Sequence, residues 1–581
     1  MTATQALALL LLIVGSCAIA ALARRHGVAA PILLVVTGIA ASYIPGVPEF
    51  RLSPNLILFA VLPPLVYTTA LESSYLNLRD NVRTLALLSV GLVLFTAVVV
   101  GEAAQLDVPG LPLAAALTLG AILAPTDAVT TASIGRRLHL PRRLLTIITG
   151  ESMLNDGTAL TLYAVAVSAA AVSVATPSPL SVARSLIVIS AGGIVVGLVL
   201  GVLIHRLRMR LRDPLVESAL SLLTPFAAYL AADSLHVSGI LAVVVTGLYL
   251  GHHGGQAHFA TRLQDMAVWR VATFVLESVA FALIGLQLRP IIQALGSRDP
   301  ARLAAEAAVV LAAVILARIV WVFPSIYLPR WLVPRIRAQD PAPRWQATFV
   351  LSWAGLRGVI SLAAAAALPT DVPQRNLLVF LTFTTVLGTL LVQGLTLPPL
   401  IRWLGVRAGP EEERADVVAQ AAAQQAASEA GLRRLDELAA QDPARAPAEV
   451  VQRLRRLAEY RQAGARERLP DGQPGGDGED SELAPSAAFR RLRREMTTAE
   501  RAEFIRLRDE RQIDDEVLDE VLHHLDLEEA MLSRDEWDAA GRDPDPGAGT
   551  PVTGLSPPGT CIAARRAESK GAIPFRERSG P

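Results

Sequence analysis

The sequence predicts an all-α protein that crosses a membrane about thirteen times and carries a charged, helical tail. Three observations support this fold class. Hydrophobic residues make up 52% of the 581 residues, long apolar runs recur up to residue 405, and charged and polar residues dominate after residue 407. We expect a membrane domain over residues 1–407, a helical tail over 408–542 and a disordered C-terminus over 543–581.

The apolar segments define the order of the predicted transmembrane helices. A helix that spans a bilayer needs roughly 20 apolar residues. We expect the first segment to stay in the membrane, because Arg24 and Arg25 follow its apolar core, whereas a signal peptide carries its positive charge before the core. The thirteen segments are 4–23, 29–48, 53–71, 83–101, 112–134, 143–173, 183–204, 215–232, 236–251, 268–288, 302–328, 345–368 and 376–405.

Loop arginines orient these segments. If the N-terminus lies outside, the inner loops contain dense arginine clusters, as in residues 136–143, 206–212 and 330–344, and the outer loops contain few arginines. Cytoplasmic loops are enriched in basic residues in this way. The pattern predicts an odd number of spans in the cell membrane, with the N-terminus outside and the tail in the cytoplasm.

Composition excludes several other classes. The 53 basic and 53 acidic residues average an apolar region and a charged tail, so the net charge says little about partners. The sequence has no domain-wide excess of basic residues, and we therefore expect no nucleic-acid partner. Only Cys17 and Cys561 are present, in an apolar segment and in the far tail, which argues against a disulfide framework or a cysteine metal site. We expect no cofactor.

Two predicted helices are interrupted in mid-membrane. The fifth segment contains Pro125, and the twelfth contains the sequence GLRG at residues 355–358. A broken helix persists at this depth only where its freed backbone groups line a cavity or meet protein partners. Segments 4–6 and 11–13 have opposite orientations, with the broken helix in the middle of each. This arrangement is typical of an inverted repeat with a site near the midplane.

The charges beside the two breaks suit the helix dipoles. Asp127 follows Pro125 at the start of the inner half-helix, where a carboxylate meets the positive end of the dipole. Arg357 follows the C-terminal end of the first half of the twelfth segment, where a cation is favoured. Together the two sites predict that the breaks contribute to one functional centre.

The sixth segment adds four polar residues at helical spacing. Ser152 and Asp156 share one face of the predicted helix, whereas Glu151 and Asn155 share a neighbouring face. Ionisable groups at this depth are costly, by about 3 kcal/mol each, and therefore suggest function. The alternative is that these acids only pair with arginines for stability. That alternative suits Glu151, which we expect to pair with Arg318 of the eleventh segment.

These residue types favour a site for a hard monovalent cation such as Na⁺ or Li⁺, which needs oxygen ligands. We expect the ligands to be Thr126, Asp127, Ser152 and Asp156. A carboxylate that binds either a cation or a proton makes the two compete. Competition combined with alternating access to the two sides of the membrane yields antiport.

Other polar residues in the apolar region have weaker interpretations. Glu72 ends the third segment and lies either at an entrance for ions or at an ordinary interfacial position. Glu277 lies within the tenth segment without an assigned role. The histidines of an inner loop are pH sensors or simply exposed, and they are His252, His253 and His258.

Seven short motifs resemble those of the monovalent cation:proton antiporter-1 family, the bacterial sodium/proton antiporters related to animal sodium/proton exchangers. They follow the family order over most of residues 1–405. The motifs are LPP (62–64), APTDAV (124–129), GESMLNDG (150–157), IGLQL (284–288), the arginine of LAR (318), GLRG (355–358) and VQGLTL (392–397).

The resemblance implies a homodimer in which a core domain moves against a dimerisation domain like an elevator. It implies that Asp156 is the ion- and proton-binding carboxylate, and that Asn155 is stabilised through Glu151, Arg318 and Arg357. The Asn-Asp pair at 155–156 resembles the electroneutral branch, with one Na⁺ exchanged for one H⁺. Glu277 departs from the family pattern.

We therefore expect a Na⁺(Li⁺)/H⁺ antiporter that uses the proton gradient to export sodium. K⁺/H⁺ exchange on the same fold is the nearest alternative, because selectivity depends on the dimensions of the cavity. A cation channel would need a filter or ring of pore residues, and a membrane sensor would need an output domain in the tail. An intramembrane enzyme would need a Ser/His pair or a His-rich metal motif at depth.

Overall fold

The structure is a computed structural model, and it is all-helical over the residues that it describes. The described residues are 3–26, 29–45, 57–172, 179–211, 213–257, 259–296, 298–441, 446–466, 485–510, Leu522, Leu525 and Leu527. The chain divides into two compact units, Met1–Gln420 and Ala421–Pro581. The predicted disordered C-terminus and His258 lie outside the described residues.

The first unit follows the order of the predicted segments. Its first half comprises α1 (Ala3–Arg25), α2 (Ala30–Ser42), η1 (Ile57–Val61), α4 (Leu62–Glu72), α5 (Tyr75–Asp80), α6 (Val82–Ala86), η2 (Leu87–Leu92), α7 (Val93–Asp107), α8 (Leu113–Leu123), α9 (Ala128–Arg137) and α10 (Arg142–Val172). Its second half comprises α11 (Pro179–Arg208), α12 (Pro214–Ser234), α13 (Gly239–His252), η3 (Gly254–Gln256), α14 (Phe259–Leu286), α15 (Leu288–Gln293), α16 (Pro300–Leu332), α17 (Pro334–Gln339), α18 (Trp345–Trp353), α19 (Val359–Ala366) and α20 (Arg375–Leu404).

Each of the thirteen predicted segments coincides, where described, with one helix or with consecutive helices of this series. Seven of the described helices are long and apolar enough to cross a membrane, and four shorter apolar helices accompany them. The predicted class, an all-helical polytopic membrane protein, is confirmed.

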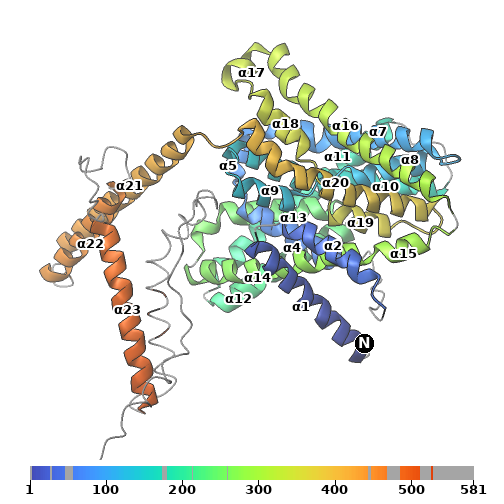
Figure 1. Ribbon diagram of the computed structural model, residues 1–581. Helices are drawn as coiled ribbons and strands as arrows, with labels where there is room; N and C mark the ends of the chain where they lie inside the picture. Colours follow the sequence, from blue (N-terminus) through green and yellow to red (C-terminus); the bar gives the residue numbers. More distant parts are fainter. Residues whose placement is uncertain are drawn as a thin grey trace, which may run out of the picture. The chain divides into compact units, whose positions relative to one another are not determined.

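Both predicted interruptions are present. The fifth segment is split into α8 and α9 by residues 124–127, and the twelfth into α18 and α19 by residues 354–358. The two breaks meet: the Asp127 N–H donates a hydrogen bond of 2.7 Å to the Leu356 carbonyl. Around them α8, α10 and α20 all contact α19, in the middle of the unit (Figure 1).

A buried ion pair supports the second break. Arg318 of α16 pairs through both terminal nitrogens with Glu151 of α10, and the Nη2–Oε2 distance is 2.9 Å. The same guanidinium donates to the carbonyl of Leu351, in the last turn of α18, where the interrupted helix has no backbone donor to offer. One side chain thus joins three helices, and the ion pair expected from the sequence is present.

The second unit contains charged helices. α21 (Pro410–Gln441) begins in the first unit and extends into the second, which also holds α22 (Ala448–Arg466) and α23 (Pro485–Asp509). Arg455 of α22 pairs with Asp436 of α21 at 2.6 Å. These helices lie within residues 408–542, the tail that the sequence predicts to be helical, and after Glu510 the structure describes only Leu522, Leu525 and Leu527.

Replacing Arg318 by alanine is expected to destabilise the protein by about 3–5 kcal/mol. Both partners are at most 2% exposed, so the change leaves the Glu151 charge buried without a partner. Thermal unfolding of the purified protein measures the loss, with Arg402→Ala as control because Arg402 is exposed on α20. An unfolding midpoint equal to that of the control would contradict this role for the pair.

Candidate functional site

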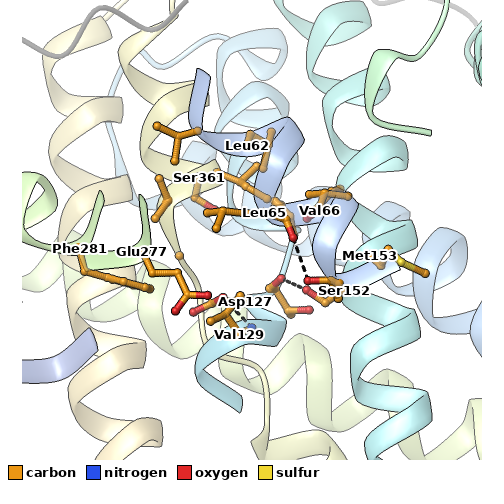
Figure 2. Close-up of a pocket in the computed structure, with 18 residues that line it drawn as sticks. Leu62, Leu65, Val66, Asp127, Val129, Ser152, Met153, Glu277, Phe281 and Ser361 are labelled. Atoms are coloured by element: carbon orange, nitrogen blue, oxygen red, sulfur yellow. Dashed lines mark hydrogen bonds between the residues drawn. The ribbon is translucent and has the colours of Figure 1, made fainter. Parts of the chain in front are cut away.

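A cavity lies beside the two helix breaks (Figure 2). It brings together the four predicted ligands Thr126, Asp127, Ser152 and Asp156. Gly358 at the end of the second break and residues 359–361 of α19 also line it, and α4 covers the cavity with an apolar wall that includes Leu62, Leu65 and Val66. Carboxylate, hydroxyl and backbone oxygens therefore converge within mainly apolar surroundings.

Asp127 is held from three directions. It is the N-cap of α9, where its Oδ1 accepts a hydrogen bond of 3.1 Å from the Val129 N–H and its Oδ2 accepts one from the Thr130 hydroxyl. Its own N–H is bound to Leu356 across the breaks. Capping explains why an aspartate stands at this position, and it fixes the direction of the carboxylate.

Thr126 connects the first break to α10. Its carbonyl accepts a hydrogen bond from the Ser152 hydroxyl, and its Oγ1 accepts one of 2.9 Å from the Asn155 amide. Two of the predicted ligands, Thr126 and Ser152, therefore hold one another in place.

Asp156 differs from its neighbours. It is only 3% exposed, and its Oδ1 accepts no hydrogen bond from a described residue. Burying a carboxylate oxygen without a donor is costly, and a bound cation or proton removes that cost. Among the predicted ligands, this carboxylate has the strongest requirement for an external partner.

The structure separates some residues that the sequence grouped together. The resemblance implies that Asn155 is stabilised through Glu151 and the arginines; in the structure its amide donates a hydrogen bond of 2.9 Å to Thr126 Oγ1 at the first break. Glu151 binds Arg318 of α16.

Two further predicted residues lie outside this network. Arg357 is fully buried, its N–H donates to Thr389 Oγ1 at 3.1 Å, and its guanidinium makes no hydrogen bond to a described residue. Glu72 is exposed at the end of α4, outside the cavity lining.

Glu277 is the residue whose role sequence reasoning missed. It projects from α14 into the same cavity, with its carboxylate directed toward Asp127 (Figure 2). No hydrogen bond or ion pair joins it to another described residue. The signal was present in the sequence as a lone acid in an apolar helix, but only the packing of α14 against α4 and α19 brings that acid to the site.

The cavity lining is suited to a hard cation. Its polar groups are oxygens, with no cysteine or histidine among the described lining residues, and hard cations prefer oxygen ligands. Three carboxylates share the space, and no arginine stands among those lining residues to neutralise them. A cation or a proton can therefore provide the compensating positive charge.

The sequence pattern described as sodium/hydrogen exchanger, transmembrane, matches residues 9–403. The chain belongs to this family. Its match to an uncharacterized Na⁺/H⁺ exchanger of Mycobacterium tuberculosis is 36% identical over 521 residues, covering 88% of this chain and 93% of that relative.

Two further relatives have more specific descriptions. A Na⁺/H⁺ antiporter of Aphanothece halophytica is 34% identical over 380 residues, covering 64% of this exchanger and 69% of the relative. A sodium, potassium, lithium and rubidium/H⁺ antiporter of Bacillus subtilis is 30% identical over 390 residues, covering 64% of this chain and 57% of the relative.

The fold is shared with a solved structure. The exchanger superimposes on the sodium proton antiporter MjNhaP1 of Methanocaldococcus jannaschii with a TM-score of 0.54 at 19% identity, covering 68% of this chain and 97% of that one. At that identity the likeness establishes the fold alone. The family that the motifs of the sequence resemble is confirmed.

Replacing Gly358 by alanine is expected to slow exchange on the order of 100-fold, because a displacement of about 1 Å at a functional group has that effect. A Cβ at residue 358 would lie 2.9 Å from the Asp127 Cβ and 3.1 Å from its Cγ, so the carboxylate must move. Sodium-dependent proton movement in inside-out vesicles measures the rate. Gly15→Ala is the matched control, since nothing lies within 4 Å of its added Cβ, and unaltered exchange in Gly358→Ala would refute the close-contact argument.

Proposed function

We propose that the protein is a secondary-active Na⁺(Li⁺)/H⁺ antiporter that uses the proton gradient to export sodium. The single observation that carries this proposal is the buried Asp156 oxygen without a hydrogen-bond donor, in a cavity lined by the oxygens of two broken helices. In this mechanism Asp156 binds either the cation or a proton. Thr126, Asp127 and Ser152 complete the shell around the cation.

The contacts of the neighbouring residues support a division of roles. Hydrogen bonds from Val129 and Thr130 satisfy Asp127, so it remains in place while Asp156 changes its partner. Asn155 contributes an amide that anchors Thr126 and not a second exchangeable carboxylate. One exchangeable site on α10 supports a stoichiometry of one Na⁺ for one H⁺.

The arrangement of the helices supports a mechanism of alternating access. In the proposed cycle the broken helices move with α10 as one core, so that the cavity opens to one side of the membrane at a time. The protein would act as a homodimer in the plasma membrane, with its N-terminus outside and its tail in the cytoplasm. Glu72 would lie at the cytoplasmic mouth.

Potassium exchange is the second candidate. It is favoured by the Bacillus subtilis relative, whose description includes potassium and rubidium beside sodium and lithium. The two candidates use the same carboxylates, so a comparison of cations separates them.

Asp156→Asn is expected to abolish exchange in a protein that still folds, because an amide can neither bind a proton nor carry the charge that attracts a cation. The measurement is dequenching of a ΔpH-sensitive dye in inside-out vesicles on successive addition of Na⁺, Li⁺ and K⁺. Asp371→Asn, at an exposed position, is the control and should behave as the parent protein.

The pattern of responses decides between the candidates. Dequenching by Na⁺ or Li⁺ supports the main proposal, and dequenching by K⁺ alone supports the second. Exchange that survives in the inserted Asp156→Asn protein would eliminate the mechanism.

Glu277→Gln is expected to retain exchange but to raise the half-saturating Na⁺ concentration roughly tenfold, equivalent to about 1.4 kcal/mol of lost attraction. The physical reason is the loss of one negative charge that faces the cavity. The same vesicle assay over a range of Na⁺ concentrations measures it, with Glu102→Gln as the exposed control. An unchanged sodium dependence would remove Glu277 from the cation site.

A further inference from the structure

A second cavity lies at the ends of four helices of the same unit. It has a volume of about 310 Å³ and is formed by the start of α10, the end of α16, the start of α18 and the end of α20. Its walls are apolar, with Leu144, Ile147 and Leu404 among them. Four arginines, Arg143, Arg330, Arg344 and Arg407, also line it, and no carboxylate stands among its described lining residues.

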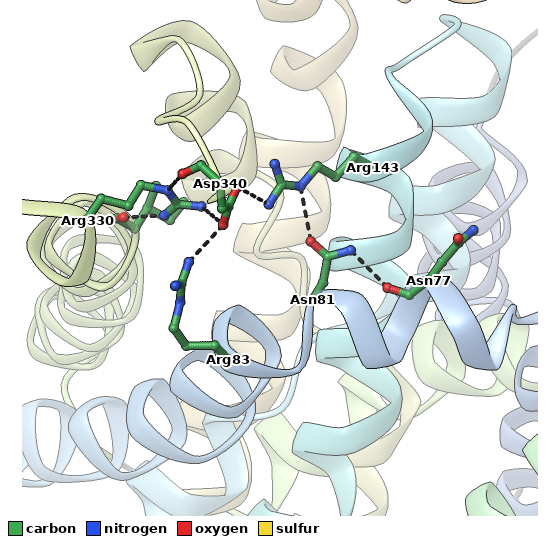
Figure 3. Close-up of polar contacts among 7 residues, drawn as sticks. Asn77, Asn81, Arg83, Arg143, Arg330 and Asp340 are labelled. Atoms are coloured by element: carbon green, nitrogen blue, oxygen red, sulfur yellow. Dashed lines mark hydrogen bonds and ion pairs between the residues drawn. The ribbon is translucent and has the colours of Figure 1, made fainter. Parts of the chain in front are cut away.

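Two of these arginines share a carboxylate with a third (Figure 3). Asp340, in the connection between α17 and α18, accepts from Arg83 at 2.8 Å, from Arg143 at 2.7 Å and from Arg330 at 2.7 Å. Burial opposes the charge of Asp340, but the hydrogen bond and charge of Arg143, with the charges of Arg330 and Arg83, hold its pKa below the usual range. At neutral pH one negative charge therefore faces three positive ones.

The remaining two arginines increase this imbalance. The guanidinium groups of Arg344 and Arg407 make no hydrogen bond or ion pair with another described residue. The five arginines and the single aspartate together carry a net charge of +4, because Asp340 offsets only one of the five positive charges. A site built in this way favours an anion with several acceptor oxygens, because guanidinium groups bind phosphate through paired donors.

The position of Arg407 is imposed by the backbone. α20 ends at Gly405, which has a φ of 65°, a left-handed conformation that glycine adopts without steric cost. The Val406 N–H then donates to Ile401 and the Ala408 N–H donates to His139 at 2.7 Å. These bonds fold residues 406–408 back over the cavity, where Val406 and Arg407 line it.

Exposed tryptophans indicate where the cavity lies relative to the membrane. Trp331, Trp345 and Trp403 stand at the ends of α16, α18 and α20, and they are 77%, 55% and 79% exposed. Tryptophan is enriched where a membrane meets water. The cavity thus lies at a membrane–water boundary, where basic pockets between helices bind lipid head groups.

We propose that this cavity binds the phosphate-bearing head group of an anionic phospholipid. Arg344, Arg407 and the remaining donor of Arg143 bind the phosphate, and the apolar wall covers the glycerol and the first methylenes of the acyl chains. A free phosphate carries the same anionic group but has no apolar part that could contact the apolar wall. We therefore favour the lipid as the source of the phosphate.

Occupancy of this site would affect the core. α10 carries Asp156 and α18 leads into the second break, so a ligand between their ends joins the two halves of the repeat on one side of the membrane. Exchange should therefore respond to the content of anionic lipid.

The test compares two double variants of the full-length protein in detergent. Arg344→Gln/Arg407→Gln removes the two arginines without partners at the cavity, and Arg335→Gln/Arg402→Gln removes two exposed arginines outside its lining. Phosphatidylglycerol, phosphatidylcholine and inorganic phosphate are added separately. Lipids retained in native mass spectrometry and the shift of the unfolding midpoint are measured.

We expect phosphatidylglycerol to bind and stabilise the parent protein and the control, and to bind the cavity variant about 30-fold more weakly, at roughly 1 kcal/mol for each interfacial arginine. If both double variants bind phosphatidylglycerol equally weakly, the loss is due to general surface charge, and the proposal is overturned. Equal stabilisation by inorganic phosphate would assign the site to a soluble anion and overturn the lipid source. Unchanged binding in the cavity variant would overturn the site itself.

Two additions keep the outcome interpretable. If the double variant does not fold, the single variants Arg344→Gln and Arg407→Gln replace it, with an expected loss of about fivefold each. The binding measurement is also made on Asp156→Asn, which should retain the lipid. If the proposed antiport fails its test, the lipid result still stands. If the lipid proposal fails, the antiport result is likewise unaffected.

Discussion

The structure depends on one constraint: backbone groups freed by a helix break need partners where no bulk water is available. The hydrogen bond between the Asp127 N–H and the Leu356 carbonyl meets this need for both breaks at once. Arg318 meets it for the end of α18 by binding Leu351, and Glu151 balances the charge that this solution introduces. The proposed cation site thus includes residues, such as Asp127, that also hold the two interrupted helices together.

The role of each acid near the two breaks follows from the partners that packing gives it. Glu151 has a guanidinium and Asp127 has two hydrogen-bond donors, so both are satisfied within the protein. Asp156 has an oxygen with neither. A membrane protein can accept the cost of such a group when a transported ion removes it during every cycle. The two faces of α10 therefore differ in role. Glu151 on one face forms a stabilising ion pair, and Asp156 on the other face carries the proposed exchange.

Much of this arrangement was predictable because it depends on local rules. Pro125 and the GLRG sequence disfavour a continuous helix, arginine counts orient loops, and helical spacing groups Ser152 with Asp156. The partner of Asn155 was not predictable, because the register between α10 and the first break is a tertiary property. Glu277 was missed for the same reason: its helix lies outside both repeats, and sequence alone does not place its carboxylate beside Asp127. The arginine excess around Asp340 likewise arises from four separate stretches of chain.

The turn after α20 has a mechanical consequence. Ala408 is tied to His139, which stands between α9 and α10, and the Arg142 N–H at the start of α10 donates to Glu412 of α21 at 3.3 Å. α9 is capped by Asp127, and α10 carries Asp156. One helix therefore leads from this turn to each of the two carboxylates, α9 back to Asp127 and α10 on to Asp156. A movement of the start of α21 would act through these two hydrogen bonds on both helices that carry the proposed ion site.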